Sequence, residues 1–190
     1  TPSDPVHPLG VYGRSKEAGE QAVRAGGPNH LILRTAWVYS PFGHNFVRTM
    51  LRVGAERDEL TVVDGQIGNP TAAHTIAEAL LTASSAMTRS PDRAFRGTFH
   101  FTGRGSVTWC GFARAIFQQA QAEGYSAAPT VTAITSDQWP TKAPRPGNSR
   151  LDSSAFQVAF GYEAEPWPED LATVLKQLSD GMGTARRRQY

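Results

Sequence analysis

The sequence predicts an α/β protein with a largely parallel sheet. Strand-like apolar runs alternate with helical segments along most of the 190 residues. Hydrophobic residues make up 39% of the chain and charged residues 19%, a balance typical of a folded domain rather than a disordered one. A chain of this length also buries about 70% of the surface that its unfolded state exposes, which is enough for a real core.

Helical segments are recognisable from apolar residues three or four positions apart and from glycine or proline at their ends. The first follows Pro5 and Pro8 and stops before Gly26. Gly124 is well placed to end the fourth, and Asp152 is the expected N-cap of the fifth. The predicted helices cover residues 10–25, 46–54, 76–87, 109–120, 152–160 and 169–178.

Strand-like segments fill most of the intervals between these helices. Residues 31–39 form a nearly continuous apolar run, which is typical of a strand buried on both faces. Residues 98–102 form another strand. The runs at 60–64 and 130–135 are assigned to a smaller lobe, and the prolines within 139–148 predict a stiff loop.

The charge balance argues against a nucleic-acid or acidic-membrane partner, because 19 basic and 17 acidic residues leave a net charge of +2. Cys110 is the single cysteine, which excludes an intrachain disulfide and a multi-cysteine zinc site and favours a reducing compartment, the cytoplasm. No histidine pair has metal-ligand spacing, so no metal site is expected. Glu17 and Glu20 are interpreted as a solvated helix face, and residues 186–188 as a frayed basic tail.

Tyr12 and Lys16 are the sharpest candidates for chemistry, because residues four apart lie on the same helical face. A nearby ammonium favours the phenolate, and a phenol tuned in this way can give or take a proton at a carbonyl or alcohol. The spacing alone also fits an ordinary exposed pair. Gly13 and Gly19 cost helix stability, and close packing against a neighbour or a ligand would explain them.

Several motifs in the same order resemble one family of reductases. Tyr12-Gly-Arg-Ser-Lys16-x-x-Gly19-Glu20 resembles the catalytic segment of the extended short-chain dehydrogenase/reductases. The stretch that includes Leu33-Arg-Thr-Ala-Trp-Val-Tyr-Ser40 is similar to the dTDP-4-dehydrorhamnose reductase family, and the resemblance extends from residue 4 to about 178. The later matching stretches are Gln66–Thr71, Phe101–Gly103 and Arg145–Asp152.

The resemblance implies the C-terminal part of a Rossmann-like parallel sheet with helices, plus a smaller α/β substrate-binding lobe. Rossmann-type elements are expected at about 1–43 and 71–103, lobe elements at about 44–70 and 104–178, and a tail at 179–190. The implied reaction is reduction of the 4-keto group of dTDP-4-dehydro-L-rhamnose to dTDP-L-rhamnose by NADPH or NADH, between which this chain does not discriminate.

The resemblance also implies roles for individual residues. Tyr12 would donate a proton to the C4 carbonyl, and Lys16 would bind the nicotinamide ribose, so both are implied as catalytic and cofactor-binding residues. On general grounds a tryptophan at a strand end is core and an arginine in a proline-rich loop is a solvated charge, and these alternatives stay open. The implied substrate-binding residues are Trp37 in the sugar pocket, Asn45 and Phe46 at the cleft, and Arg145 at the diphosphate.

Two features of this family are missing from the chain. No glycine-rich strand–turn–helix motif for a dinucleotide pyrophosphate is present, since Gly103-x-Gly105 lacks a third glycine at the required spacing. Only eleven residues precede Tyr12, so the Ser or Thr that polarises the carbonyl falls outside them. We therefore expect a piece of a longer protein, inactive alone, with an exposed sheet that favours self-association.

Two other functions remain open at this point. One is a non-catalytic regulatory subunit of the same fold, as the beta subunit of methionine adenosyltransferase is related to this family. The other is a nucleotide-sugar epimerase or dehydratase, against which the Arg34–Tyr39 stretch argues.

Overall fold

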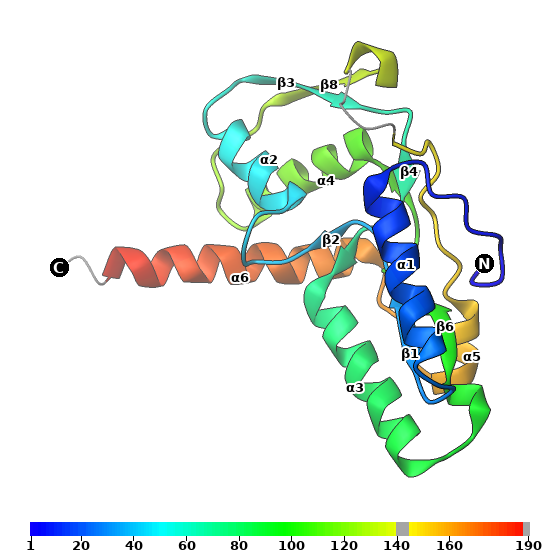
Figure 1. The fold of residues 1–190 in the computed structure, drawn as a ribbon. Coiled ribbons are helices and arrows are strands. Elements are labelled where there is room, and N and C mark those ends of the chain that lie inside the picture. The colour runs from blue at the N-terminus through cyan, green and yellow to red at the C-terminus, as the bar shows by residue number, and fades with distance from the viewer. Residues whose placement is uncertain (140–144, 188–190) are drawn as a thin grey trace.

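The computed structural model describes residues 1–139 and 145–187, with side chains to residue 181. It confirms the α/β fold class (Figure 1). The helices are α1 (Val11–Ala25), α2 (Phe46–Gly54), α3 (Ala73–Arg89), α4 (Trp109–Ala122), α5 (Ser154–Phe160) and α6 (Trp167–Arg187). The strands are β1 (Leu31–Arg34), β2 (Val38–Tyr39), β3 (Glu59–Val63), β4 (Ile67–Gly68), β5 (Thr71–Ala72), β6 (Gly97–His100), β7 (Val107–Thr108) and β8 (Thr130–Ile134).

The strands pair in twos, and three of the four pairs are parallel. β1 pairs with β6, β2 with β5 and β3 with β8 in parallel, whereas β4 and β7 are antiparallel. Parallel partners require a crossover, and helices provide it, as the alternating sequence pattern predicts. None of the helices in the described part of the chain is long and apolar enough to cross a membrane.

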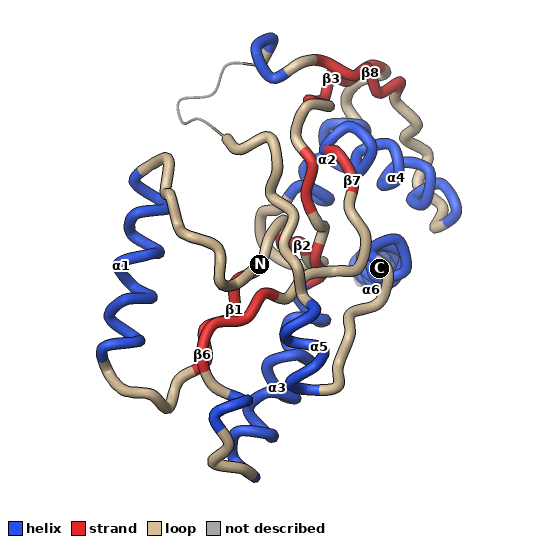
Figure 2. Tube along the Cα trace, turned by 90° about the vertical axis from the view of Figure 1, so that its right-hand side faces the viewer, coloured by secondary structure: helices blue, strands red, loops and turns tan. Residues whose placement is uncertain are grey.

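One half of the molecule is layered. Figure 2 shows β1 and β6 between α1 on one side and α3 with α5 on the other. Phe99 of β6 and Phe101, the residue that follows β6, both pack against Phe156 of α5. On the opposite side α1 has no buried residue. The apolar core of this half therefore lies between the strands and the α3–α5 layer.

The other half is a lobe of β3, β8, α2 and α4 (Figure 1). Leu60, Val62 and Val131 of the two strands pack against the inner face of α4, where Cys110 is fully buried. Burial also raises the pKa of the Cys110 thiol, which fits a small apolar residue rather than a nucleophile. Helix α6 packs against α4 on one side and β5 on the other, so it lies against both halves.

Some element boundaries differ from the sequence predictions. The apolar run at 31–39 is not one strand, because Trp37 has a φ of 48° and separates β1 from β2. The strand at 98–102 ends at His100, since the Thr102 amide donates to the Ser153 hydroxyl instead of extending the ladder. Helix α6 continues past residue 178 to Arg187.

The cap of α5 also differs from its prediction. Ser153, not Asp152, is the N-cap residue of α5. Asp152 lies one residue earlier, where its carboxylate accepts a hydrogen bond from the Ser154 amide at 2.9 Å. This bond lowers the pKa of the Asp152 carboxyl. The predicted frayed tail at 186–188 falls only partly on described residues. Residue 188 lies outside them, and the side chains from residue 182 onward are not described.

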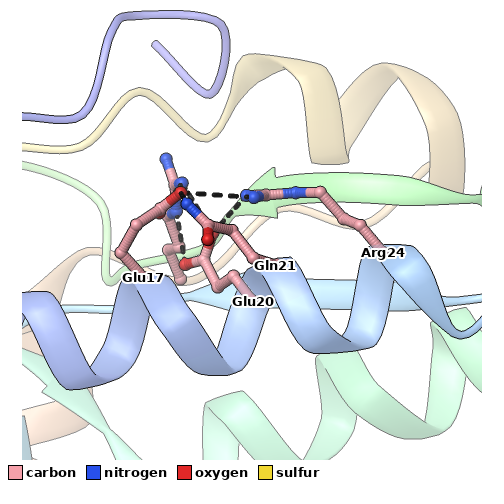
Figure 3. A network of polar contacts seen from close by, with 5 residues as sticks. Glu17, Glu20, Gln21 and Arg24 are labelled. Carbon is pink, nitrogen blue, oxygen red and sulfur yellow. Dashed lines mark hydrogen bonds and ion pairs between the residues drawn. The ribbon is translucent and has the colours of Figure 1, made fainter.

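Glu17 and Glu20 are not a solvated face, contrary to the sequence interpretation. The Arg34 guanidinium on β1 donates from Nε and Nη2 to the two carboxylate oxygens of Glu20, at 2.8 and 2.7 Å. Arg24 reaches both Glu17 and Glu20 from the last turn of α1 (Figure 3). Arg34 holds the pKa of the Glu20 carboxyl below its ordinary value. This bidentate pair joins α1 to β1 where no apolar core does so.

Candidate functional site

Tyr12 and Lys16 lie together in the first half of α1. The Lys16 Nζ is 5.4 Å from the centroid of the Tyr12 ring, within the range of a cation–π contact. Tyr12 is 77% exposed, and Lys16 is exposed as well. The glycine between them has a structural reason, since a Cβ at Gly13 would lie 2.9 Å from the Pro8 Cβ, whereas Gly19 faces open space. The spacing therefore brings the phenol and the ammonium onto one accessible face, as predicted.

Asn45 organises the loop that leads into α2. Its Oδ1 accepts from the Arg48 amide at 3.2 Å, so it is the N-cap of α2. Its Nδ2 donates to the carbonyl oxygens of Ser40 and Phe42, at 2.8 and 3.2 Å. Both ends of the amide are therefore bonded to backbone, and Asn45 shapes the loop beside the cavity described next.

A cavity of about 700 Å³ opens in the lobe, within the size range of small-molecule sites. Its apolar walls come from α2, β3 and the start of α4, and two guanidinium groups, Arg57 and Arg145, stand at it. Phe46 and Arg145 are the two predicted substrate residues that it contains, whereas Trp37 and Asn45 are outside its wall. The principal wall residues are Phe46, Met50, Val53, Arg57, Leu60, Val62, Gln66, Trp109, Trp139 and Arg145.

Trp37 reaches this cavity through Trp109. The two indole rings are stacked with centroids 3.5 Å apart and planes 9° apart. Trp109 also contacts Phe46, at 4.6 Å between ring centroids. Both indoles are half-buried, so this aromatic group is part core and part accessible surface. Trp37 is thus neither a simple core residue nor a direct wall of the cavity.

The segment after Arg145 is fixed to β4. The Ile67 amide donates to the Gly147 carbonyl at 2.9 Å, and the Ser149 amide donates to the Ile67 carbonyl at 2.8 Å. Arg145 itself is exposed and lies two residues before this anchor. Pro144, predicted to stiffen this loop, lies outside the described residues.

Three of the sequence motifs meet at Asn69. Its Nδ2 donates to the Gly105 carbonyl at 2.6 Å, and its Oδ1 accepts from the Leu151 amide at 3.0 Å. The Thr71 hydroxyl accepts from the Gly103 amide at 3.2 Å. The stretches around 66–71, 101–105 and 147–152 are therefore held by buried side-chain-to-backbone bonds, which are costly to break. Their contribution to the site is to hold β4 and the Arg145 segment in place.

A second, smaller hollow lies near the end of β6 and the start of α5. Its volume is about 260 Å³, and Thr102, Arg104, Asp152 and Glu163 are among its lining residues. None of the predicted site residues lines it.

A buried polar group joins α3 to α6. Asp170 is 5% exposed, and its carboxylate accepts from the Thr75 hydroxyl at 2.8 Å and lies 3.2 Å from the His74 Nε2. Burial raises the pKa of the Asp170 carboxyl. No group of three or more His, Cys, Asp or Glu side chains suited to a metal ion occurs in the part of the chain that the structure describes.

His100 is a buried histidine at the end of β6. It is 4% exposed, and neither ring nitrogen has a hydrogen-bond partner. Burial lowers its pKa to about 4. The folded protein therefore keeps His100 neutral at pH values where the unfolded chain, with a pKa of about 6.5, binds a proton.

We expect this histidine to make stability fall with acidification. The His100 contribution is complete above pH about 6.5 and is lost as the pH falls toward about 4, by roughly 2–4 kcal/mol of unfolding free energy. Urea unfolding at several pH values measures this. Carboxylates titrate in the same pH range. The readout is therefore the difference in the pH dependence of the unfolding free energy between the protein and its His100→Gln variant, and the exposed His7→Gln variant is the control. Equal pH slopes for the protein and His100→Gln would contradict the prediction.

Sequence reasoning missed Arg57, Trp109 and Trp139 as site residues. Trp109 begins the helix predicted at 109–120, and it both packs against the core and lines the cavity. Arg57 follows α2 in a charged turn, and Trp139 is an exposed aromatic residue beside the proline-rich loop. An exposed tryptophan next to prolines was the one available signal.

Comparisons with known proteins identify the family of the chain. Residues 1–180 match the family model described as the RmlD substrate binding domain. A dTDP-4-dehydrorhamnose reductase of Sinorhizobium fredii is 43% identical over 166 residues, which cover 87% of this chain and 56% of that protein.

Solved structures give the same result. The chain is similar to a dTDP-4-dehydrorhamnose reductase from Clostridium acetobutylicum, with a TM-score of 0.82 and 35% identity over 93% of this chain and 58% of that one. It is also similar to the reductase of Bacillus anthracis in complex with NADP, with a TM-score of 0.81, 30% identity and the same coverage. The chain thus spans somewhat more than half the length of these relatives. With its α/β fold and its matched family model, the chain belongs to the RmlD substrate-binding-domain family.

Proposed function

We propose that this chain binds the dTDP-sugar and supplies the proton donor in reduction of dTDP-4-dehydro-L-rhamnose to dTDP-L-rhamnose. The observation that carries the proposal is the lobe cavity, in which aromatic walls and two guanidinium groups face the same space. Aromatic side chains suit a nucleobase, and a guanidinium fork suits the oxygens of a diphosphate. We assign the nucleotide to the cavity, with Arg57 and Arg145 at the diphosphate.

The sugar is assigned to the region between this cavity and α1. Figures 1 and 2 both show that α1 begins at the end that is nearer the lobe. Trp37, stacked on the cavity wall residue Trp109, is the side chain assigned to the sugar ring. Asn45 supports this assembly through the loop that it caps, and Phe46 contributes a cavity wall.

Tyr12 and Lys16 are assigned to the reacting carbonyl. Neither the Tyr12 hydroxyl nor the Lys16 ammonium forms a hydrogen bond with another described residue, so both are available to a ligand. This availability fits the nicotinamide end of NADPH or NADH, which supplies hydride to C4 when bound. Lys16 would hold the nicotinamide ribose, and Tyr12 would give its hydroxyl proton to the C4 oxygen.

The diphosphate assignment is tested by calorimetric titration with dTDP and with thymidine, which lacks the phosphates. Loss of a charge-assisted hydrogen bond is worth about 1.5–3 kcal/mol. We therefore expect Arg57→Ala and Arg145→Ala each to weaken dTDP binding by about tenfold or more and to leave thymidine binding unchanged.

Arg52→Ala is the matched control. Arg52 is an exposed arginine on α2, pairs with Glu56 and is outside the cavity wall. It should bind dTDP like the unmodified protein. If dTDP and thymidine bind equally well to all of these proteins, or if neither binds, the cavity is not the nucleotide site.

A further inference from the structure

Trp37 is held in a backbone conformation that a bulky residue rarely adopts. Its φ of 48° lies in the left-handed region, which is sterically strained for an L-residue other than glycine. Its carbonyl accepts a hydrogen bond from the Thr71 amide at 3.2 Å, next to the β2–β5 pair. Because the strain is local, contacts of the side chain and its surroundings must maintain it.

Gly68 leaves space for the Trp37 indole. A Cβ at Gly68 would overlap Cε2 of that ring and would lie 2.6 Å from its Nε1 and 2.8 Å from its Cζ2. Gly68 is buried in β4, where it pairs with Val107 of β7. A methyl group at Gly68 therefore cannot be accommodated unless the indole moves.

Trp109 covers the face of the same indole. It is the first residue of α4, directly after the N-cap Thr108, whose hydroxyl accepts from the Gly111 amide at 3.0 Å. Gly68 pairs with Val107 and Ile67 with Thr108, so the β4–β7 ladder brings both Gly68 and the start of α4 against the Trp37 indole. Backbone pairing and a capped helix thus fix both contacts of the indole.

We propose that Gly68 and Trp109 are positioning residues that hold the Trp37 indole in the one orientation in which it contacts the sugar of the dTDP-sugar. This rests on the proposed contact of Trp37 with the sugar. Gly68 acts by leaving space and Trp109 by stacking. The ratio of the dissociation constants for dTDP and dTDP-L-rhamnose would therefore depend on Gly68 and Trp109, although neither residue touches the sugar.

The test compares the dissociation constants of dTDP and dTDP-L-rhamnose in the protein and in Gly68→Ala. Gly68 is not a wall of the nucleotide cavity. We expect Gly68→Ala to keep its dTDP affinity and to lose about two- to tenfold of its preference for dTDP-L-rhamnose. Gly65→Ala should keep the preference, because Gly65 lies in the β3–β4 connection just before β4 and a Cβ there makes only an ordinary contact with the Ser136 hydroxyl.

Circular dichroism supplies a readout that a general loss of stability does not produce. Two indoles stacked in this way give an exciton couplet in the far ultraviolet, which Trp37→Phe and Trp109→Phe identify by removing it. Gly68→Ala retains both indoles, and we expect it to lose the couplet while its helical signal persists. If Gly68→Ala does not fold, Trp109→Leu and Trp109→Phe are compared in its place. Trp109→Phe keeps an aromatic ring against Trp37 and should keep the preference for dTDP-L-rhamnose, whereas Trp109→Leu should lose it.

The outcomes separate the two proposals. If the protein has no preference for dTDP-L-rhamnose, or if Trp37→Ala leaves that preference intact, the sugar contact is wrong and the positioning role is wrong with it. If Trp37→Ala abolishes the preference but Gly68→Ala and Trp109→Leu retain it, the sugar contact stands and only the positioning role is overturned.

Discussion

Gly103→Ala is expected to lower the free energy of unfolding by several kcal/mol. A Cβ at Gly103 would overlap the carbonyl oxygen of Pro70 and would lie 3.4 Å from the Trp167 Cβ. The Pro70 carbonyl is backbone and cannot rotate away, and Thr71 next to it is bonded to the Gly103 amide. We expect a loss of about 4 kcal/mol or more, at the upper end of single-residue effects. Urea unfolding followed by circular dichroism measures it.

Gly19→Ala makes the same chemical change with the opposite expected sign. Gly19 lies inside α1, and a Cβ there meets nothing within 4 Å. Alanine is favoured over glycine inside a helix by about 1 kcal/mol, so this variant should gain stability.

A Gly103→Ala protein as stable as the parent would show that the segments around Asn69 can separate freely, contrary to the structure.

Tyr12→Phe is expected to abolish reduction while leaving dTDP-L-rhamnose binding intact. Loss of a positioned proton donor typically costs about 10²–10⁴-fold in rate. The assay is NADPH oxidation with dTDP-4-dehydro-L-rhamnose, in a hybrid where residues 1–180 replace the matching part of the Bacillus anthracis reductase. Phenylalanine removes only the hydroxyl, so the α1 helix and the Lys16 contact with the ring are retained.

The control for this experiment is Tyr125→Phe. Tyr125 packs at the edge of the core beyond α4 and lines no part of the cavity. Removal of the Tyr125 hydroxyl should leave the turnover rate of the hybrid within a small factor of that of the unmodified hybrid. If Tyr12→Phe turns over as fast as Tyr125→Phe, the phenol is not the proton donor and the catalytic part of the proposed function is wrong.

The longer elements could be predicted from the sequence because their periodicity is strong. The α1 and α4 helices begin and end within two residues of their predicted bounds, and β3 and β8 match equally well. The two-residue strands β4, β5 and β7 could not be predicted, since two residues show no period, and β2 was predicted only as part of the longer run at 31–39. The break at Trp37 could not be predicted either, because the residues that contact its indole, Gly68 and Trp109, are distant in sequence.

The candidate site divides in the same way. Tyr12 with Lys16 is a local pattern on one helix, and their shared helical face is confirmed, whereas their roles stay a prediction. Arg57 and Trp109 join the cavity only because β3 and α4 pack together, and neither has a local signal of ligand binding. Arg34 with Glu20 likewise joins a strand to a helix across fourteen positions, so the sequence interpretation of Glu20 as solvated was wrong.

One helix links the stability of the two halves. Leu171, Val174 and Leu175 of α6 complete the core shared with α4, and the adjacent Asp170 is bonded to Thr75 of α3. Opening either region exposes the same helix to water, so we expect the lobe and the layered half to open together. Amides in the two regions should then exchange with solvent in a single concerted event, and the geometry between the lobe cavity and α1 would be set by folding itself.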